Sequence, residues 1–459
     1  MIKIICNKQN KVQQLIELTK LFEVYIKIEA IISVTYKDTE VELIFKTQDA
    51  YVNRIVDVRF LKPEIYMILS NYTSQTLPWG VLTGVRPNKL VHKFLHQNLS
   101  DSLIRSILTN EYFIAADKVE LLLEVTKAQQ KILAQNKPNE ISIYIGIPFC
   151  PSRCIYCSFP AFVLAQKVHK IDDYLLALEK EIKGVAKDKL IRSLYIGGGT
   201  PTSLSELQFR KLMTIVAENF DLSKIEEYTV EAGRPDTITA DKLQAMKQYG
   251  VSRISINPQS MNQKTLDLIG RSHKVSEIYD VYNMAIRLGF DNINMDMIIG
   301  LPEETVGDVE FTLTELAKMS PTNITVHTMA IKTASSLNQQ KHRYNLAQSA
   351  VIRDMLDCTS SHMYQMGLKP YYMYRQKNIL GNFENIGYTK DGYNCIYNVE
   401  VMEEQQTILA LGAGGASKFI NGLSIERFIN VKGIEEYIAR IDEMIDKKNT
   451  IFAFENVKN

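Results

Sequence analysis

The sequence predicts an α/β protein whose centre is a partial barrel of six strand–helix units, a partial (βα)6 barrel. Short apolar runs recur between 141 and 330 with helical segments between them, which is the pattern of a parallel sheet with helices outside it. Six units are too few for a closed eight-strand barrel. A polar stretch containing proline, residues 135–140, separates this region from a differently patterned N-terminus.

The N-terminal region, residues 1–140, mixes strand and helix patterns. Residues 31–37 and 40–46 alternate apolar and polar side chains on either side of Asp38 and Thr39, which is typical of a hairpin. Residues 114–134 carry apolar side chains at helical spacing. We therefore expect an α+β domain over residues 1–140.

The central region, residues 141–330, should hold the barrel. One intervening helix is expected over 239–249, with Thr239 as its N-cap and Gly250 just past its end, and another over 305–318. The expected parallel strands are 141–147, 193–196, 227–231, 252–256, 292–297 and 324–329. Residues 331–459 are expected to form a mostly helical region that covers the substrate, with a helix over 342–366.

The charge balance and hydropathy exclude several functional classes. The chain has 53 basic and 52 acidic residues, so no broad cationic surface for nucleic acid is expected. No stretch of 18 apolar residues occurs, and the first apolar run is too short for a signal peptide. We expect a cytoplasmic protein without a membrane span.

Three of the six cysteines lie within eight residues, in a C-x3-C-x2-C pattern formed by Cys150, Cys154 and Cys157. They follow an apolar strand, so they should lie on a loop at the carboxyl edge of the sheet, where sites in parallel α/β folds form. Three thiolates suit a [4Fe–4S] cluster with one iron free of protein ligands, which can chelate the amino and carboxylate groups of S-adenosylmethionine (SAM). The alternative is a zinc loop with a distant fourth ligand, since structural zinc takes four.

The remaining cysteines, Cys6, Cys358 and Cys395, are isolated in the sequence. We expect them to be buried small apolar side chains, as free cysteines usually are. The glycine-rich segments 197–202 and 412–416 would let the backbone approach a ligand closely, or would simply shape tight turns.

Polar side chains mark the ends of the expected strands. Glu231 and Asp296 suit a ribose diol, and Arg271 suits the methionine carboxylate. Gln259 follows the fourth strand, and Tyr156 stands before the third cysteine, where it would pack on the adenine side. Each of these groups could instead be a buried polar group satisfied within the protein.

His327, on the sixth expected strand, could face the cavity, or could be a core or surface residue.

The cysteine motif, GGGTPT at 197–202, Glu231, Gln259, Arg271 and Asp296 together resemble, in order and spacing, the oxygen-independent coproporphyrinogen III dehydrogenases, the HemN-like radical SAM family. Residues 79–87 (WGVLTGVRP) and 374–378 (YRQKN) resemble the HemZ branch of that family. With these two segments the resemblance covers most of the chain.

The resemblance implies a reaction in haem biosynthesis, in which two propionates of coproporphyrinogen III become the vinyl groups of protoporphyrinogen IX. It also implies a [4Fe–4S] cluster, two SAM molecules, and a low-potential electron donor such as flavodoxin or ferredoxin. By position, the contacts to the SAM on the cluster would be Tyr144, Gly198, Glu231 and Ala416. Those to the second SAM would be Tyr156, Gly199, Thr200, Gln259, Arg271, Asp296 and Ala330.

The sequence departs from the best-known members in three places. It has Ser158-Phe159 where they have a fourth cysteine, Gly146 where they have a histidine, and no recognisable N-terminal arm. These departures leave the substrate-binding residues undetermined, and Arg375 and Lys377 are the candidate partners of the propionates.

Two other functions on the same scaffold stay open. One is a haem chaperone of the HemW kind, a group that carries a motif similar to His-Asn-x-x-Tyr-Trp at its haem site. The nearest stretch here, residues 393–398 (YNCIYN), lacks the histidine and the tryptophan. The other is a radical SAM enzyme with a different tetrapyrrole substrate.

Overall fold

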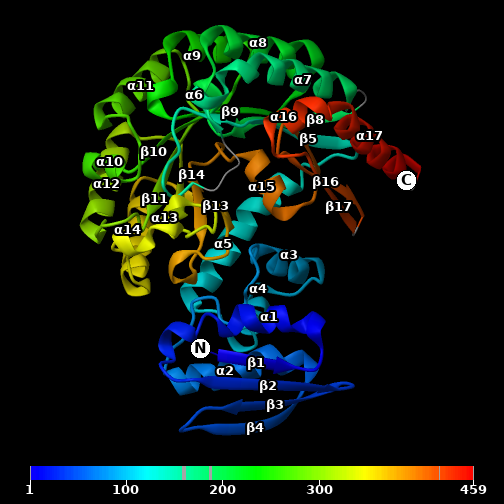
Figure 1. Cartoon of the computed structure of the whole chain (residues 1–459), viewed down its shortest axis with the longest axis vertical. Helices are drawn as coiled ribbons and strands as arrows, with labels where there is room; N and C mark the ends of the chain where they lie inside the picture. Colours follow the sequence, from blue (N-terminus) through cyan, green and yellow to red (C-terminus); the bar gives the residue numbers. More distant parts are fainter. Residues whose placement is uncertain (1, 158–161, 186–188, 423, 458–459) are drawn as a thin grey trace. The chain divides into compact units, whose positions relative to one another are not determined.

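The computed structural model describes residues 2–157, 162–185, 189–422 and 424–457, which form two compact units (Figure 1). The first comprises Met1–Thr126 and Arg375–Lys377, and the second comprises Lys127–Tyr374 and Asn378–Asn459. This division differs from the expected one in two ways. The first boundary falls inside helix α5 (Ala116–Leu133), which runs on to the polar stretch, and the C-terminal region joins the barrel because its strands pair with the barrel strands.

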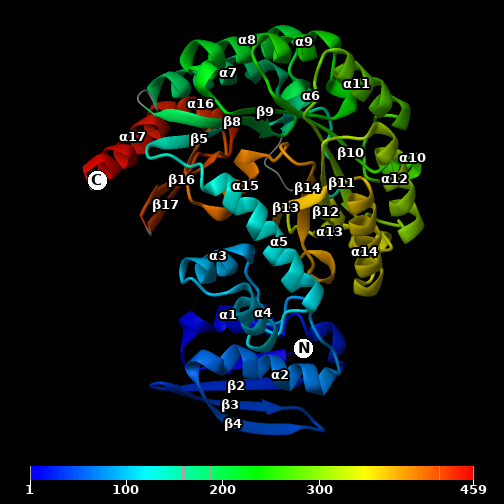
Figure 2. The same ribbon diagram turned by 180° about the vertical axis from the view of Figure 1, so that it is seen from behind.

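The first unit contains a four-stranded sheet in the order β1-β2-β3-β4, with α1 and α2 on one face (Figure 2). The predicted hairpin is confirmed: Lys37 pairs with Glu40, and Asp38 turns the chain with a φ of 50°. The helix predicted over 114–134 is α5. The other elements are β1 (Ile2–Cys6), β2 (Ala30–Lys37), β3 (Glu40–Lys46), β4 (Tyr51–Asp57), α1 (Gln9–Thr19), α2 (Leu61–Thr73), α3 (Asn88–His96) and α4 (Asp101–Asn110).

The second unit contains an 11-stranded sheet, and all six expected parallel strands lie in it in chain order. They are β5 (Glu140–Ile147), β8 (Leu190–Gly198), β9 (Glu227–Gly233), β10 (Arg253–Gln259), β11 (Ile293–Ile299) and β12 (Asn323–Thr328). The sheet does not close on itself, because β13 and β17 stand at its two ends. The predicted α/β fold with a partial barrel is therefore confirmed.

Helices cover the outer side of these strands (Figure 1). The Thr239 side chain caps α9 as predicted, and Gly250 follows α9 with a φ of 79°. The helix predicted over 305–318 is α12, and the Thr305 side chain caps it. The helices are α7 (Ile171–Gly184), α8 (Glu206–Asn219), α9 (Ala240–Gln248), α10 (Gln263–Leu268), α11 (Val275–Arg287) and α12 (Val306–Met319). The short elements β6 (Phe149–Cys150), β7 (Phe162–Val163) and α6 (Leu164–Lys167) lie between β5 and α7.

The C-terminal region, for which the sequence predicts mainly helix, also supplies five strands. β14 pairs with β12 and β15 pairs with β5, so both edges of the six-strand sheet are covered, as exposed strand edges require. The strands are β13 (Lys369–Tyr374), β14 (Asn385–Thr389), β15 (Thr407–Leu411), β16 (Ala416–Asn421) and β17 (Ser424–Ile429). The helices are α13 (Ser336–Gln339), α14 (Ser349–Gln365), α15 (Ile396–Glu403), α16 (Ile434–Ala439) and α17 (Ile441–Val457). α14 starts later than the expected residue 342, because a 3-10 turn over 341–343 precedes it.

The six parallel strands have one apolar and one polar side. On the apolar side, which meets the helices, the Tyr228 hydroxyl lies 3.8 Å from Met213 Sδ on α8. On the polar side, the Ser193 hydroxyl donates to Ser142 Oγ at 2.7 Å. Because side chains alternate along a strand, the enclosed side of the barrel, its lumen, is polar. The lumen-side residues include Tyr144, Tyr195, Thr229, Glu231, Arg253, Ser255, Asn294, Asp296, Thr325 and His327.

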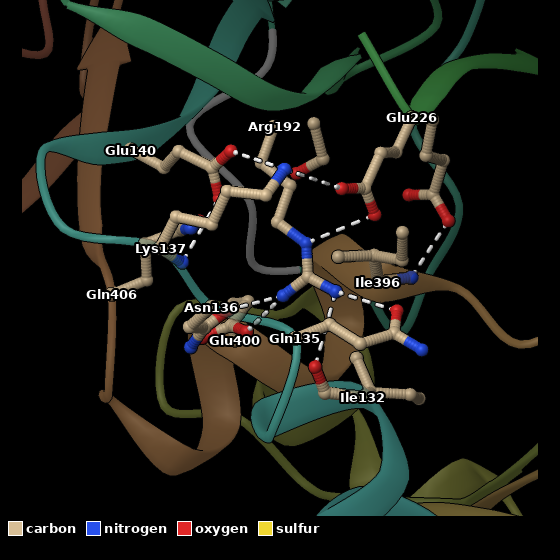
Figure 3. Close-up of polar contacts among 12 residues, drawn as sticks. Ile132, Gln135, Asn136, Lys137, Glu140, Arg192, Glu226, Ile396, Glu400 and Gln406 are labelled. Carbon is tan, nitrogen blue, oxygen red and sulfur yellow. Dashed lines mark hydrogen bonds and ion pairs between the residues drawn. The ribbon is translucent and has the colours of Figure 1, made fainter.

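Arg192, at the start of β8, joins three segments at the opposite end of the strands from the cysteines (Figure 3). Its guanidinium, fully buried, donates to Glu400 Oε1 on α15 at 3.1 Å and to the Ile132 carbonyl on α5 at 3.1 Å. It also pairs with Glu226 at 3.2 Å and contacts Asn136. One planar cation therefore fixes the end of α5, α15 and the strand starts together.

In the part of the chain that the structure describes, no helix is both long and apolar enough to cross a membrane.

Replacing Arg192 with Met should reduce the free energy of unfolding of the second unit by about 3–5 kcal/mol, because Glu400 would stay buried without its cation. The melting temperature should fall accordingly. The matched control is Arg210→Met, whose ion pair with Asp241 is partly exposed and should contribute less than about 1 kcal/mol. Thermal unfolding followed by circular dichroism compares the two. Equal effects of the two substitutions would contradict the structural role given to Arg192.

Candidate functional site

The three clustered cysteines lie on the loop that follows β5, residues 148–157, here called the cysteine loop. Cys154 is buried, Cys150 and Cys157 are half-buried, and the Cys157 amide donates to the Cys154 carbonyl at 3.1 Å. The loop is at the carboxyl edge of the parallel strands, as predicted. Ser158 and Phe159, the positions of the expected departure, lie outside the described residues.

The glycine run, residues 197–199, ends β8 and supports the cysteine loop. The Gly199 amide donates to the Ile147 carbonyl at 2.9 Å, and the Thr200 amide donates to the Phe149 carbonyl at 2.8 Å. A Cβ at Gly199 would lie 2.6 Å from the Phe149 oxygen and 3.0 Å from Cys150 Sγ. The glycines are therefore required for close packing of two backbones, and Thr200 Oγ1 lies 3.5 Å from Cys150 Sγ.

Glu231 lies in the lumen beside the glycine run. Its two carboxylate oxygens accept from the Tyr195 hydroxyl at 2.6 Å and from the Gly198 amide at 3.3 Å. Burial raises the pKa of Glu231 to about 7, and the nearby charge of Asp296 adds to the rise. Tyr144 stacks near Tyr195, with ring centroids 6.1 Å apart.

Tyr156, Arg271 and Gln259 form a second group next to the cysteine loop. Arg271 is buried, donates to the Asn257 carbonyl at 2.8 Å, and lies 3.5 Å from the Tyr156 hydroxyl. Its Nε and the Oε1 of Gln259 are buried without a hydrogen-bond partner in the structure. Gln259 also has a φ of 70°, which is uncommon for a residue other than glycine. Unpaired buried polar atoms and a strained backbone are typical of a ligand site.

The remaining predicted contacts lie at the same edge but on the flanks. Asp296, on β11, accepts from Asn294 Nδ2 at 2.7 Å. Ala330 follows β12 and pairs with Ile379, while Ala416 is exposed and begins β16. The structure thus places the glycine run in contact with Glu231 on one side and with Cys150 on the other.

The turn at 412–416 is shaped by a buried ion pair that the sequence did not reveal. Glu181 and Lys448 are both fully buried and 2.5 Å apart, and Glu181 also accepts from the Gly412 amide at 2.8 Å. A Cβ at Gly412 would lie 2.5 Å from the Gly146 oxygen. This turn therefore packs directly on the strand that leads into the cysteine loop.

The donor set of the loop fits an iron–sulfur cluster. Burial raises the pKa of the Cys150 thiol to about 11, so cluster binding would have to release protons, while Arg234 opposes that rise. Within the described ranges, no three His, Cys, Asp or Glu side chains stand close enough to share a single metal ion. Three thiols on one loop, with glycine backbone against Cys150, match the ligands that a cluster with one open iron needs.

The other cysteines lie elsewhere. Cys395 is fully buried, as expected, at the start of α15, and its thiol lies 3.3 Å from Glu227 Oε1. Cys6 and Cys358 are only half-buried.

Comparison with known proteins places this site in a family. The Radical SAM superfamily profile matches residues 144–316, which hold all three cysteines of the loop. The oxygen-independent coproporphyrinogen-III oxidase-like protein HemZ of Bacillus subtilis is 41% identical over 391 residues, 83% of this chain and 78% of that protein. The chain belongs to the HemN-like radical SAM family, in its HemZ branch.

Two further relatives show the fold of this family and the range of functions named within it. The solved structure of coproporphyrinogen III oxidase (HemN) from Escherichia coli is 25% identical, with a TM-score of 0.56 over 70% of this chain and 73% of that one. The haem chaperone HemW of Bacillus subtilis is 32% identical over 308 residues, 66% of this chain and 76% of that protein. Members with a radical SAM fold thus carry both enzyme and chaperone names.

The two segments that resemble the HemZ branch meet within the first unit. Arg375 is buried over the Trp79 ring, 5.3 Å from its centroid, and donates to the Leu82 carbonyl at 2.6 Å. Lys377 pairs with Glu17 at 2.9 Å. Arg375 is thus engaged by Trp79 and Leu82 within its own unit, and Lys377 has a carboxylate partner, so these contacts argue against either side chain as a propionate partner.

Replacing Gly199 with Ala should reduce iron loading of the protein strongly, because the new Cβ would force the cysteine loop away from the glycine run. Iron and sulfide content after anaerobic reconstitution measures this. The matched control is Gly84→Ala, since a Cβ there meets nothing within 4 Å. Full loading of the Gly199 variant would show that the loop does not depend on this contact.

Replacing Glu231 with Gln should change the pH dependence of stability. The raised pKa means that ionising Glu231 destabilises the fold. The protonated carboxyl therefore makes its full contribution to folding stability below its ordinary pKa of 4.5, and this contribution is lost as pH rises through about 7. The variant should therefore gain stability relative to the native protein between pH 5 and pH 8, on the order of 2 kcal/mol. Melting temperatures across that range check it, and parallel curves would contradict the raised pKa.

Proposed function

We propose that this protein catalyses the oxygen-independent oxidative decarboxylation of coproporphyrinogen III to protoporphyrinogen IX. The observation that carries the proposal is the three-cysteine loop seated on the glycine run, in a chain 41% identical to a coproporphyrinogen-III oxidase-like protein. The polar lumen behind that loop supports it, because it offers hydrogen-bonding groups to a polar cosubstrate.

Cys150, Cys154 and Cys157 would hold a [4Fe–4S] cluster, which would supply the single electron that breaks the S–C5′ bond of SAM into methionine and a 5′-deoxyadenosyl radical able to take a hydrogen atom from the β-carbon of a propionate. Loss of carbon dioxide, with transfer of one electron to an external one-electron acceptor, would then leave a vinyl group, and two such rounds would complete the product. A low-potential protein such as flavodoxin or ferredoxin is the proposed electron donor to the site.

The chain's own residues would bind and orient SAM. Arg271, a buried cation with an unpaired Nε, suits the methionine carboxylate. Glu231, whose carboxylate accepts from the Gly198 amide, suits the SAM on the cluster, with Tyr144 nearby. Gln259 and Asp296 would contact a second SAM, as the family resemblance implies.

The haem-chaperone function is the competing proposal, since HemW is among the relatives. The stretch 393–398, nearest to the HemW haem motif, lacks the histidine and leads into α15, where Glu227 accepts from the Ile396 amide at 2.7 Å. Tyr397 stacks on Tyr195 with centroids 4.5 Å apart. These contacts hold residues 393–398 against other parts of the protein, which favours the enzymatic function over haem binding at this segment.

The deciding experiment incubates anaerobically reconstituted protein with coproporphyrinogen III, SAM and dithionite, and reads the vinyl products by mass spectrometry. We expect sequential loss of two carbon dioxide molecules and formation of methionine and 5′-deoxyadenosine. Stoichiometric haem binding without turnover would support the chaperone, and SAM cleavage without vinyl product would support another substrate.

Replacing Cys154 with Ala should abolish cluster binding and SAM cleavage, because one of the three proposed ligands is lost. The matched control is Cys358→Ala, a half-buried cysteine on α14, which should keep native cleavage rates. Wild-type SAM cleavage by the Cys154 variant would refute the proposed ligand set.

A further inference from the structure

Asp296 and His327 face each other across a short gap in the lumen. Asp296 Oδ2 and His327 Nε2 are 3.8 Å apart, which is too long for a direct hydrogen bond. The two side chains are 19% and 27% exposed, so both reach the open part of the lumen. The gap between a carboxylate oxygen and an imidazole nitrogen is the feature that needs an explanation.

The carboxylate is held in one orientation by its neighbour. Asn294 Nδ2 donates to Asp296 Oδ1 at 2.7 Å, and Asn294 Oδ1 in turn accepts from the Thr325 hydroxyl at 2.9 Å. Oδ2 is thereby directed to the His327 side. Burial alone would raise the pKa of Asp296, but its contacts with His327 and Asn294 hold it below its ordinary value, so the group is an acceptor.

The imidazole is held from its other nitrogen. The Tyr374 hydroxyl lies 3.2 Å from His327 Nδ1, and the two rings meet edge to face with centroids 6.4 Å apart. When that hydroxyl donates to Nδ1, the neutral ring carries its proton on Nε2, the nitrogen that faces Asp296. Tyr374 in turn stacks on Tyr372, whose hydroxyl lies 3.4 Å from the Thr325 hydroxyl oxygen.

These contacts close a ring of side chains from β11, β12 and β13 around the gap. An acceptor (Asp296 Oδ2) and a donor (His327 Nε2–H) are both fixed, and neither is satisfied by the other. An oxygen about 2.8 Å from both atoms fits between them, because the distance of 3.8 Å is less than twice that length.

We propose that Asp296 and His327 together bind one hydroxyl of a nucleoside ribose, which donates to Asp296 Oδ2 and accepts from His327 Nε2–H. Tyr374 is the positioning residue that fixes the tautomer of His327. The inference rests on the proposed function for the presence of SAM, and it adds a contact that the comparison of motifs did not supply. Glu231 differs from Asp296, because each of its carboxylate oxygens already accepts one hydrogen bond, from Tyr195 or from Gly198.

Other charged groups bear on the pair but do not replace it. Arg253 is fully buried at the start of β10, and its charge favours the ionised form of Asp296. At Glu231 burial outweighs the same charge, so the pKa of Glu231 stays raised. Arg253 acts on Asp296 without filling the gap in front of it.

The test measures SAM binding to the cluster-loaded full chain by equilibrium dialysis, which gives both stoichiometry and affinity. The ligands are SAM and its 2′-deoxy and 3′-deoxy analogues. We expect His327→Ala to weaken SAM binding about tenfold and to leave the affinity for one of the two deoxy analogues unchanged. His327→Gln, which keeps a donor, should recover part of the loss, and Tyr374→Phe should show a smaller loss. His362→Ala, on α14, is the matched control.

The double variant gives the sharpest readout. If one hydroxyl bridges both side chains, Asp296→Ala combined with His327→Ala should lose little more than Asp296→Ala alone. Equal SAM affinity in the native protein and His327→Ala, or equal losses for SAM and both analogues, would overturn the inference and leave the proposed function standing. Failure of the native, cluster-loaded protein to bind SAM would instead count against the proposed function.

Discussion

The backbone contact between the glycine run and the cysteine loop is the constraint on which the site depends. Two amide-to-carbonyl hydrogen bonds, from Gly199 to Ile147 and from Thr200 to Phe149, hold the end of β8 against the chain that carries Cys150. Side chains at these glycines would separate the two backbones. The position of the first cysteine is therefore set by hydrogen bonds between neighbouring strands, before any cofactor contributes.

The lumen behind that contact is polar, and it is stabilised at both ends by buried charge. At the end away from the cysteines, Arg192 joins α5, α15 and β8 (Figure 3). At the cysteine end, Glu181 and Lys448 fix the turn at 412–416 against β5. Buried pairs of this kind contribute little net stability over apolar packing, but removing one partner is costly, so they define the geometry of the site.

Two carboxylates in the lumen illustrate how one environment produces two different groups. Glu231 is desolvated with only neutral donors to its oxygens, so its pKa rises to about 7. Asp296 is also buried, but His327 and Asn294 hold its pKa down. A site that offers one carboxylate with a raised pKa and one with a lowered pKa presents two different groups to polar ligands.

The sequence alone determined the six parallel strands, the hairpin, the Thr239 cap of α9 and the place of the cysteines, because each depends on local periodicity, a capping side chain or a position just after a strand. Only the tertiary structure decided how 331–459 contributes, since β14 and β15 pair with strands far away in the chain. It also decided that Arg375 packs on Trp79 and that His327 faces Asp296. Spacing along a chain predicts which side of a strand a residue occupies, whereas the partner it meets there depends on the register of strands that are distant in sequence.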